Sequence, residues 1–141
     1  MKYQYTATPY FNTKGHLTKR PIVEVELRGA SRTLKGLGLI DSGADTTIMN
    51  IEYAKILGIP LDQNRTKEFI GIAADPMRCF IGSVSLKVQH VPTPVTTAVA
   101  FIDSPSVDIL LGQEDFFEHF RVKFEKDHDT FELQLSKKAV K

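Results

Sequence analysis

The sequence has no tryptophan, a single cysteine and no long apolar run. One cysteine excludes an intrachain disulfide, which fits a reducing compartment. No stretch approaches the roughly 18 consecutive apolar residues that a membrane-spanning helix needs, and residues 1–13 are too often interrupted by polar residues for a signal peptide. We therefore expect a cytoplasmic protein with no membrane segment.

An excess of charge of either sign is also missing. The 18 basic and 17 acidic side chains give a formal net charge of +1. A chain this close to neutral has no electrostatic reason to bind nucleic acid or a membrane surface. The lysines at 137, 138 and 141 are expected to form a solvated basic tail. With 141 residues, 42% hydrophobic and 25% charged, the composition predicts one ordinary globular domain with its own core.

Patterns for metal, phosphate or nucleophilic chemistry are weak or missing. The four histidines lie outside the His-x-x-x-His and Cys-x-x-Cys spacings of metal sites: His16, His90, His119 and His128. Asp127-His128-Asp129 is interpreted as a hairpin turn rather than a cation site. No Gly-x-Ser-x-Gly surrounds Ser42, and Cys79 has no neighbouring cationic helix to lower its pKa. We expect no metal and no cofactor.

The most informative stretch is the heptad Asp41-Ser42-Gly43-Ala44-Asp45-Thr46-Thr47. It follows the apolar run 37–40, which predicts a buried strand, and the apolar pattern resumes directly after it. Asp41 is therefore expected where a strand ends, with its carboxylate against an apolar wall. Gly43 is expected to use backbone angles that are closed to other residues, and Ser42 to bond locally or to a partner chain.

The remaining pattern predicts one all-β domain with two short helices. Alternating or short apolar runs predict strands at 22–28, 32–40, 66–73, 78–89, 95–102, 107–111, 120–124 and 130–135. Asn50 is a good N-cap for a helix over 51–57 that Gly58 ends, and 113–119 is the second expected helix. Asp103-Ser104-Pro105 repeats the Asp-Ser pair, but proline replaces glycine and too little chain follows for a second lobe, so a loop is expected.

The heptad resembles the active-site loop of retroviral-type aspartic proteases, the retropepsins, whose signature is Asp-Ser/Thr-Gly-Ala-Asp-Thr between apolar strands. A second family feature, Ile109-Leu110-Leu111-Gly112 followed by a helical pattern, lies at the expected distance downstream. The resemblance implies the all-β, single-domain retropepsin-like acid protease fold over residues 21–136. Residues 1–20 are then an N-terminal extension or hairpin, which either covers a sheet edge or assists dimer formation, and 137–141 the basic C-terminal tail.

The resemblance also implies a reaction. Peptide hydrolysis needs one group that takes a proton from water and another that gives one to the carbonyl oxygen. Two carboxylates about 3 Å apart meet this need because they share one proton, as in aspartic proteases. This chain has one such site, so the second Asp41 must come from a second copy in a symmetric homodimer.

Supporting roles carry over by position. Five residues are expected to contact the peptide substrate, two from the loop and three from a covering flap: Gly43, Asp45, Gly71, Ile72 and Ala73. Four others are expected to support the loop, Ser42 by hydrogen-bonding across the two-fold axis: Ser42, Ala44, Thr46 and Gly112. The peptide would lie as an added strand between the flap and the active-site loop. The family often has an arginine after the glycine, which pairs with the second aspartate. Here Gln113 and Glu114 follow, so that ion pair is lost.

We therefore expect an aspartic endopeptidase acting on peptides or proteins, with no nucleic-acid or membrane partner. Two alternatives stay open. The chain could be a catalytically inactive retropepsin-like dimeric module that binds an extended peptide or only dimerises, because a fold does not guarantee an activity. It could also be a domain excised from a polyprotein.

Overall fold

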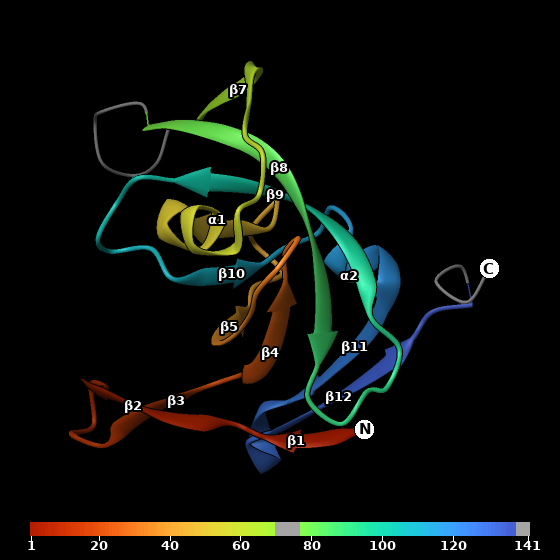
Figure 1. Ribbon diagram of the computed structural model, residues 1–141. Helices are drawn as coiled ribbons and strands as arrows, with labels where there is room; N and C mark the ends of the chain where they lie inside the picture. The colour runs from red at the N-terminus through yellow and green to blue at the C-terminus, as the bar shows by residue number, and fades with distance from the viewer. Residues whose placement is uncertain (70–76, 138–141) are drawn as a thin grey trace.

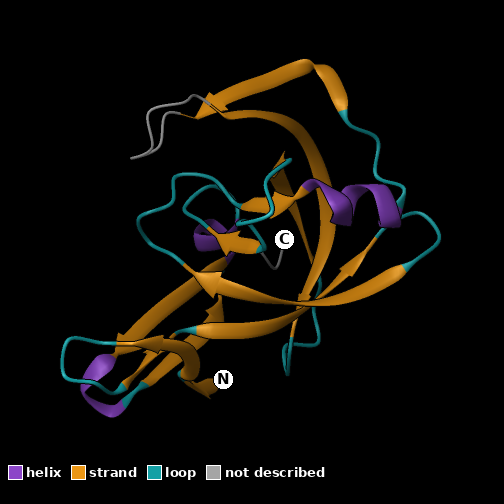
Figure 2. Ribbon diagram, turned by 90° about the vertical axis from the view of Figure 1, so that its left-hand side faces the viewer, coloured by secondary structure: helices purple, strands orange, loops and turns teal. Residues whose placement is uncertain are grey.

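The computed structural model describes residues 1–69 and 77–137 (Figure 1). Within them the chain is mostly β, and Figure 2 shows the two short helices among the strands. The strands are β1 (Lys2–Gln4), β2 (Thr6–Phe11), β3 (Leu17–Arg20), β4 (Ile22–Arg28), β5 (Thr33–Ile40), β6 (Ile48–Asn50), β7 (Asp62–Phe69), β8 (Met77–Val88), β9 (Val95–Ile102), β10 (Ile109–Leu111), β11 (Phe120–Glu125) and β12 (Thr130–Leu135). The helices are α1 (Ile51–Leu57), α2 (Phe116–His119) and the 3-10 turn η1 (Lys126–His128).

The main sheet closes on itself. Its strand order is β4-β5-β10-β6-β9-β8-β7, and β4 also pairs with β8. Six strands therefore form a ring, and β7 extends outside it as the partner of β8. Closure removes most exposed sheet edges, so the hydrogen-bonding groups of these strands are satisfied within the sheet.

The main core is one buried apolar cluster that joins these strands to α2, β11 and β12. In β4, Val23, Val25 and Leu27 are buried while Glu24 and Glu26 are only half-buried, as the alternation of apolar and polar residues predicts. The largest fully buried side chains also come from the other strands and from α2: Phe101, Phe116, Phe120, Phe131, Met49 and Leu111. The expected all-β, single-domain fold class with two short helices is confirmed.

The terminal segments form two smaller sheets. β1 pairs with β12, which pairs with β11, so residues 2–4 cover one edge of that sheet. β2 and β3 form a separate hairpin, whose turn lies at residues 12–15. In that turn the Asn12 side chain accepts the N–H groups of Lys14 and His16 at 2.9 and 3.0 Å, and Gly15 has a φ of +77° that favours glycine.

The first helix has the predicted bounds. Asn50 Oδ1 accepts the N–H of Glu52 at 2.9 Å, and Gly58 ends the helix with a φ of +68° while its N–H donates to the Ala54 and Lys55 carbonyls. The predicted apolar face is buried: Ile51, Ala54 and Leu57. The cap also fixes the 103–108 loop, because Asn50 Nδ2 donates to the carbonyls of Ser104 and Val107.

The second helix is shorter than predicted. It was expected over 113–119 but begins at Phe116. The N–H groups of Gln113 and Glu114 donate instead to the carbonyls of Ala44 and Asp45, and Asp115 has a φ of +64°, outside the helical region. A long-range contact therefore overrides the local helical pattern.

The two strands predicted on either side of the flap turn are present as β7 and β8, which pair antiparallel up to Phe69 and Met77. β7 begins four residues before the expected start at residue 66, and β8 ends one residue before the expected end at residue 89. Three predicted substrate contacts, Gly71, Ile72 and Ala73, lie outside the described residues. Asp103-Ser104-Pro105 lies in the loop between β9 and β10, as expected.

Candidate active site

Asp41 lies at the point where β5 ends. Its N–H donates to the Leu111 carbonyl at 3.0 Å, which extends the parallel pairing of β5 with β10 by one residue. The side chain is half-buried, and its Oδ1 accepts the N–H of Gly43 at 2.9 Å. The Asp41 carbonyl accepts the Ala44 N–H at 3.2 Å. A tight turn thus fixes the orientation of one carboxylate oxygen.

Gly43 lies close to the Asp41 carboxylate and has no positive φ. The expectation that it uses angles closed to other residues is wrong, because its φ lies outside the positive range. A Cβ at this position would lie 3.3 Å from Asp41 Oδ1. Glycine therefore leaves room for the carboxylate and for its hydrogen bond to the Gly43 N–H.

Gly112 lies directly against the loop. A Cβ here would lie 2.5 Å from the Thr46 carbonyl oxygen and 2.7 Å from that of Ala44, distances that no side chain tolerates. Its N–H donates to the buried Thr47 Oγ1 at 3.1 Å. The loop and the strand β10 therefore pack backbone against backbone, and only glycine permits that approach.

Gln113 is a site residue that sequence reasoning missed. Its Nε2 donates to the Ser42 carbonyl at 2.8 Å, while its N–H donates to the Ala44 carbonyl at 2.8 Å. Glu114 continues the contact: its N–H donates to the Asp45 carbonyl, and its Oε2 accepts from Thr46 Oγ1 at 3.5 Å. Residues 112–114 therefore hold the loop along most of its length.

The loop's remaining side chains divide into an anchored and an exposed group. Thr46 and Thr47 are buried, and the Thr47 carbonyl accepts the N–H of Ala100 in β9 at 2.9 Å. The Ser42 and Asp45 side chains are exposed. Neither side chain has a hydrogen bond or ion pair with the described side chains, those of residues 1–61 and 79–137, or with the described backbone. The structure thus brings the predicted loop residues together and leaves two polar side chains available to a ligand or partner.

The 103–108 loop is tied to α1 by a second contact. Tyr53 donates a 2.5 Å hydrogen bond from its hydroxyl to Asp108 Oδ1. Partial burial, together with this bond and the negative charge of Asp108, raises the pKa of Tyr53 above its ordinary value. Tyr53 is therefore a neutral donor at any physiological pH.

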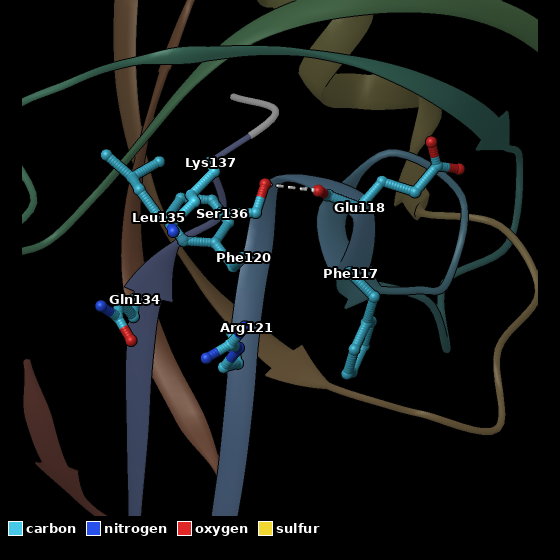
Figure 3. A pocket seen from close by; sticks show the side chains of 8 residues that line it. All are labelled: Phe117, Glu118, Phe120, Arg121, Gln134, Leu135, Ser136 and Lys137. Carbon is cyan, nitrogen blue, oxygen red and sulfur yellow. Dashed lines mark hydrogen bonds between the residues drawn. The ribbon is translucent and has the colours of Figure 1, made fainter. Parts of the chain in front are cut away.

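The pocket in Figure 3 lies elsewhere and holds none of the predicted site residues. It has a volume of about 530 Å³ and is lined by residues of α2, β11 and the end of β12, among them Phe117, Arg121 and Leu135. Its one hydroxyl, Ser136 Oγ, donates to the Glu118 carbonyl at 2.8 Å. The lining offers no pair of carboxylates and no nucleophile beside a base.

The other weak sequence candidates have ordinary structural roles. Lys126 Nζ lies 2.7 Å from Asp129 Oδ1 across the turn η1, and this hydrogen bond lowers the pKa of Asp129. Cys79 is buried. In the described part of the chain no three His, Cys, Asp or Glu side chains cluster as metal ligands do, and no helix has the length and apolarity to cross a bilayer.

Among known proteins, similarity to this chain is found with solved structures. No family model and no curated protein matches this sequence. Among solved structures, the chain is similar to EIAV protease in complex with the inhibitor HBY-793 (23% identity, 73% of this chain and 86% of that one, TM-score 0.46). It is similar to a retropepsin-like aspartic protease from Rickettsia conorii, with 16% identity over 94% of this chain and 90% of that one and a TM-score of 0.49. A third similar structure is the retroviral protease-like domain of Ddi1 from Leishmania major, with 14% identity over 80% of this chain and 88% of that one and a TM-score of 0.49.

Proposed function

We propose that this protein is a homodimeric aspartic endopeptidase in which the Asp41 side chains of two copies activate a water molecule. The observation that carries the proposal is the loop at the end of β5. It presents one carboxylate with an oxygen fixed by the Gly43 N–H, on a backbone held by residues 112–114. A catalytic group must be held in a fixed orientation, whereas a polar turn at the surface has no such requirement.

The chemistry follows from pairing two such carboxylates. At about 3 Å apart they cannot both ionise, so the pair holds one proton. The ionised member takes a proton from water as the water attacks the peptide carbonyl, and the protonated member donates to the carbonyl oxygen. Neither a covalent intermediate nor a cofactor takes part.

A second copy supplies the second carboxylate. Asp103 is the other Asp-Ser aspartate, but it lies in a loop tied to the N-cap of α1 through the Ser104 carbonyl and lacks a following glycine. A two-fold axis beside Asp41 places two identical loops face to face. The exposed Ser42 then lies where it can hydrogen-bond to the partner's loop.

The substrate is an extended peptide. Gly43 and Asp45 contact its backbone from below, and the exposed Asp45 carboxylate accepts its N–H groups. The flap residues Gly71, Ile72 and Ala73 cover it from above, an assignment that rests on the sequence pattern. In this proposal residues 21–136 are the protease domain, 1–20 an N-terminal hairpin and 137–141 a basic tail.

The test compares two aspartates that each precede a serine. Purified Asp41→Asn and Asp103→Asn variants are incubated with a mixed peptide library at pH 4 to 7, and products are identified by mass spectrometry. Asp41→Asn is expected to lose cleavage at least about 1000-fold while remaining folded and dimeric, and Asp103→Asn to cleave as the native protein does. A statine-like transition-state mimic should block the native enzyme. Full activity of Asp41→Asn would rule out the dyad, and a native dimer that cuts nothing would support the inactive peptide-binding module.

A further inference from the structure

The hairpin of β2 and β3, residues 6–20, forms an N-terminal arm with an apolar tip. It is a two-stranded sheet of its own, and Figure 1 shows it extending from the rest of the chain. Tyr10, Phe11 and Leu17 are 65%, 72% and 45% exposed. Phe11 lies directly opposite Leu17 in the strand register, so their side chains form one continuous patch. Apolar patches on a projecting hairpin are typical of surfaces that bind another protein.

The arm leaves the domain beside the catalytic loop. Pro21, the residue after β3, accepts the N–H of Ile40 through its carbonyl at 2.9 Å, and Asp41 follows Ile40 directly. At about 3.3 Å per residue, Leu17 lies about 13 Å along the strand from this point. A segment of that length that begins beside the proposed two-fold axis is long enough to lie on the second copy.

The charge of the arm complements the loop. The arm contains three basic residues and no acidic one: Lys14, Lys19 and Arg20. Asp45 and Glu114, at the surface of the loop, are exposed carboxylates. Among the described side chains, those of residues 1–61 and 79–137, no lysine, arginine or histidine lies within ion-pair distance of either. The loop of a second copy therefore offers an acidic surface for the basic residues of the arm.

Contacts to the arm's own domain hold it near its base. The Lys19 Nζ lies 3.6 Å from Asp129 Oδ2, an exposed ion pair of the kind that contributes little to stability. The N–H of Tyr5, just before β2, donates to the Asp129 carbonyl at 2.7 Å. The tip beyond these contacts remains exposed.

We propose that the N-terminal arm packs on a second copy of this chain, with its apolar tip on the partner's surface and its lysines facing the partner's acidic loop. The proposal rests on the proposed function only for the position of the two-fold axis. Dimer formation can be measured without any cleavage, so the two proposals can fail separately.

The first test measures the dimer dissociation constant by sedimentation velocity. The Phe11→Ser/Leu17→Ser double variant is compared with Ile56→Ser, which removes a 44% exposed apolar side chain from α1. We expect the arm variant to dimerise at least about ten-fold more weakly, since it removes two interface anchors, and Ile56→Ser to stay within about two-fold of the native protein. Circular dichroism checks that both variants stay folded. An unchanged dissociation constant in the arm variant would overturn the proposal.

The second test locates the arm. Copies labelled with ¹⁵N are mixed with unlabelled copies, and a carbodiimide joins lysine amines to carboxylates in direct contact. We expect cross-links from Lys14 or Lys19 to Asp45 or Glu114 that join a labelled to an unlabelled peptide. Cross-links from these lysines found only within one copy would show that the arm lies on its own domain, and an absence of any cross-link to the loop would point to another partner; either result contradicts the proposal.

Discussion

The Gln113 side chain donates a 2.8 Å hydrogen bond to the carbonyl oxygen of Ser42, the residue after the candidate catalytic aspartate. The retropepsin pattern often has an arginine at this position, which pairs with the loop's second aspartate. Here a neutral amide holds the loop through its backbone, and the Asp45 carboxylate stays exposed. Among the described residues the loop is therefore held by hydrogen bonds to its backbone rather than by an ion pair.

Replacing Gln113 is expected to reduce catalysis more than substrate binding. Gln113→Ala removes one hydrogen bond and should lower kcat about five-fold with little change in KM. Gln113→Glu should lower kcat further, because a carboxylate would face the Ser42 carbonyl oxygen. Steady-state kinetics on a cleaved peptide gives both values, and Gln134→Ala, an exposed glutamine of β12, is the matched control. A Gln113→Glu variant with native kcat would show that this contact does not position the loop.

Two buried threonines should respond oppositely to the same substitution. Thr47 Oγ1 accepts the N–H of Gly112, so Thr47→Val leaves that buried donor unpaired and should destabilise the protein by about 1–3 kcal/mol. Thr97 is equally buried, but its Oγ1 has no hydrogen-bond partner among the described residues. Thr97→Val should therefore be neutral or stabilising. Urea unfolding of both variants decides the matter, and equal losses of stability would contradict the assigned contact.

Stability should fall at alkaline pH because of Tyr53. Its pKa is raised above the ordinary 10.0 by partial burial and by its hydrogen bond to Asp108. A raised pKa in the folded state means that the stabilisation is complete below pH 10 and is lost as the pH rises further, when the unfolded chain ionises first. Thermal unfolding between pH 8 and 11 should show a steeper loss for the native protein than for Tyr53→Phe. Parallel curves for the two proteins would contradict the assignment.

Local signals in the sequence predicted most of the fold. The alternation in β4 and the capping residues Asn50 and Gly58 act within a few residues, so they can be interpreted without knowing the tertiary structure. The heptad likewise predicted the place of Asp41 at the end of a strand.

What the sequence could not predict depends on contacts distant in the chain. The predicted start of α2 at residue 113 is wrong because the N–H groups of Gln113 and Glu114 donate to carbonyls of the loop. The bond from Gln113 to Ser42 spans 71 residues, and no local pattern contains it. The reason for glycine at position 43 was also missed, because it depends on where the Asp41 carboxylate lies.

The most direct test of the account is the separation of the two Asp41 carboxylates in a crystal structure of the protein with a statine-like inhibitor. The account predicts a symmetric dimer in which the two side chains lie about 3 Å apart, near enough to share one proton. A monomer, or a dimer in which each Asp41 faces solvent with no second carboxylate beside it, would contradict the proposed mechanism.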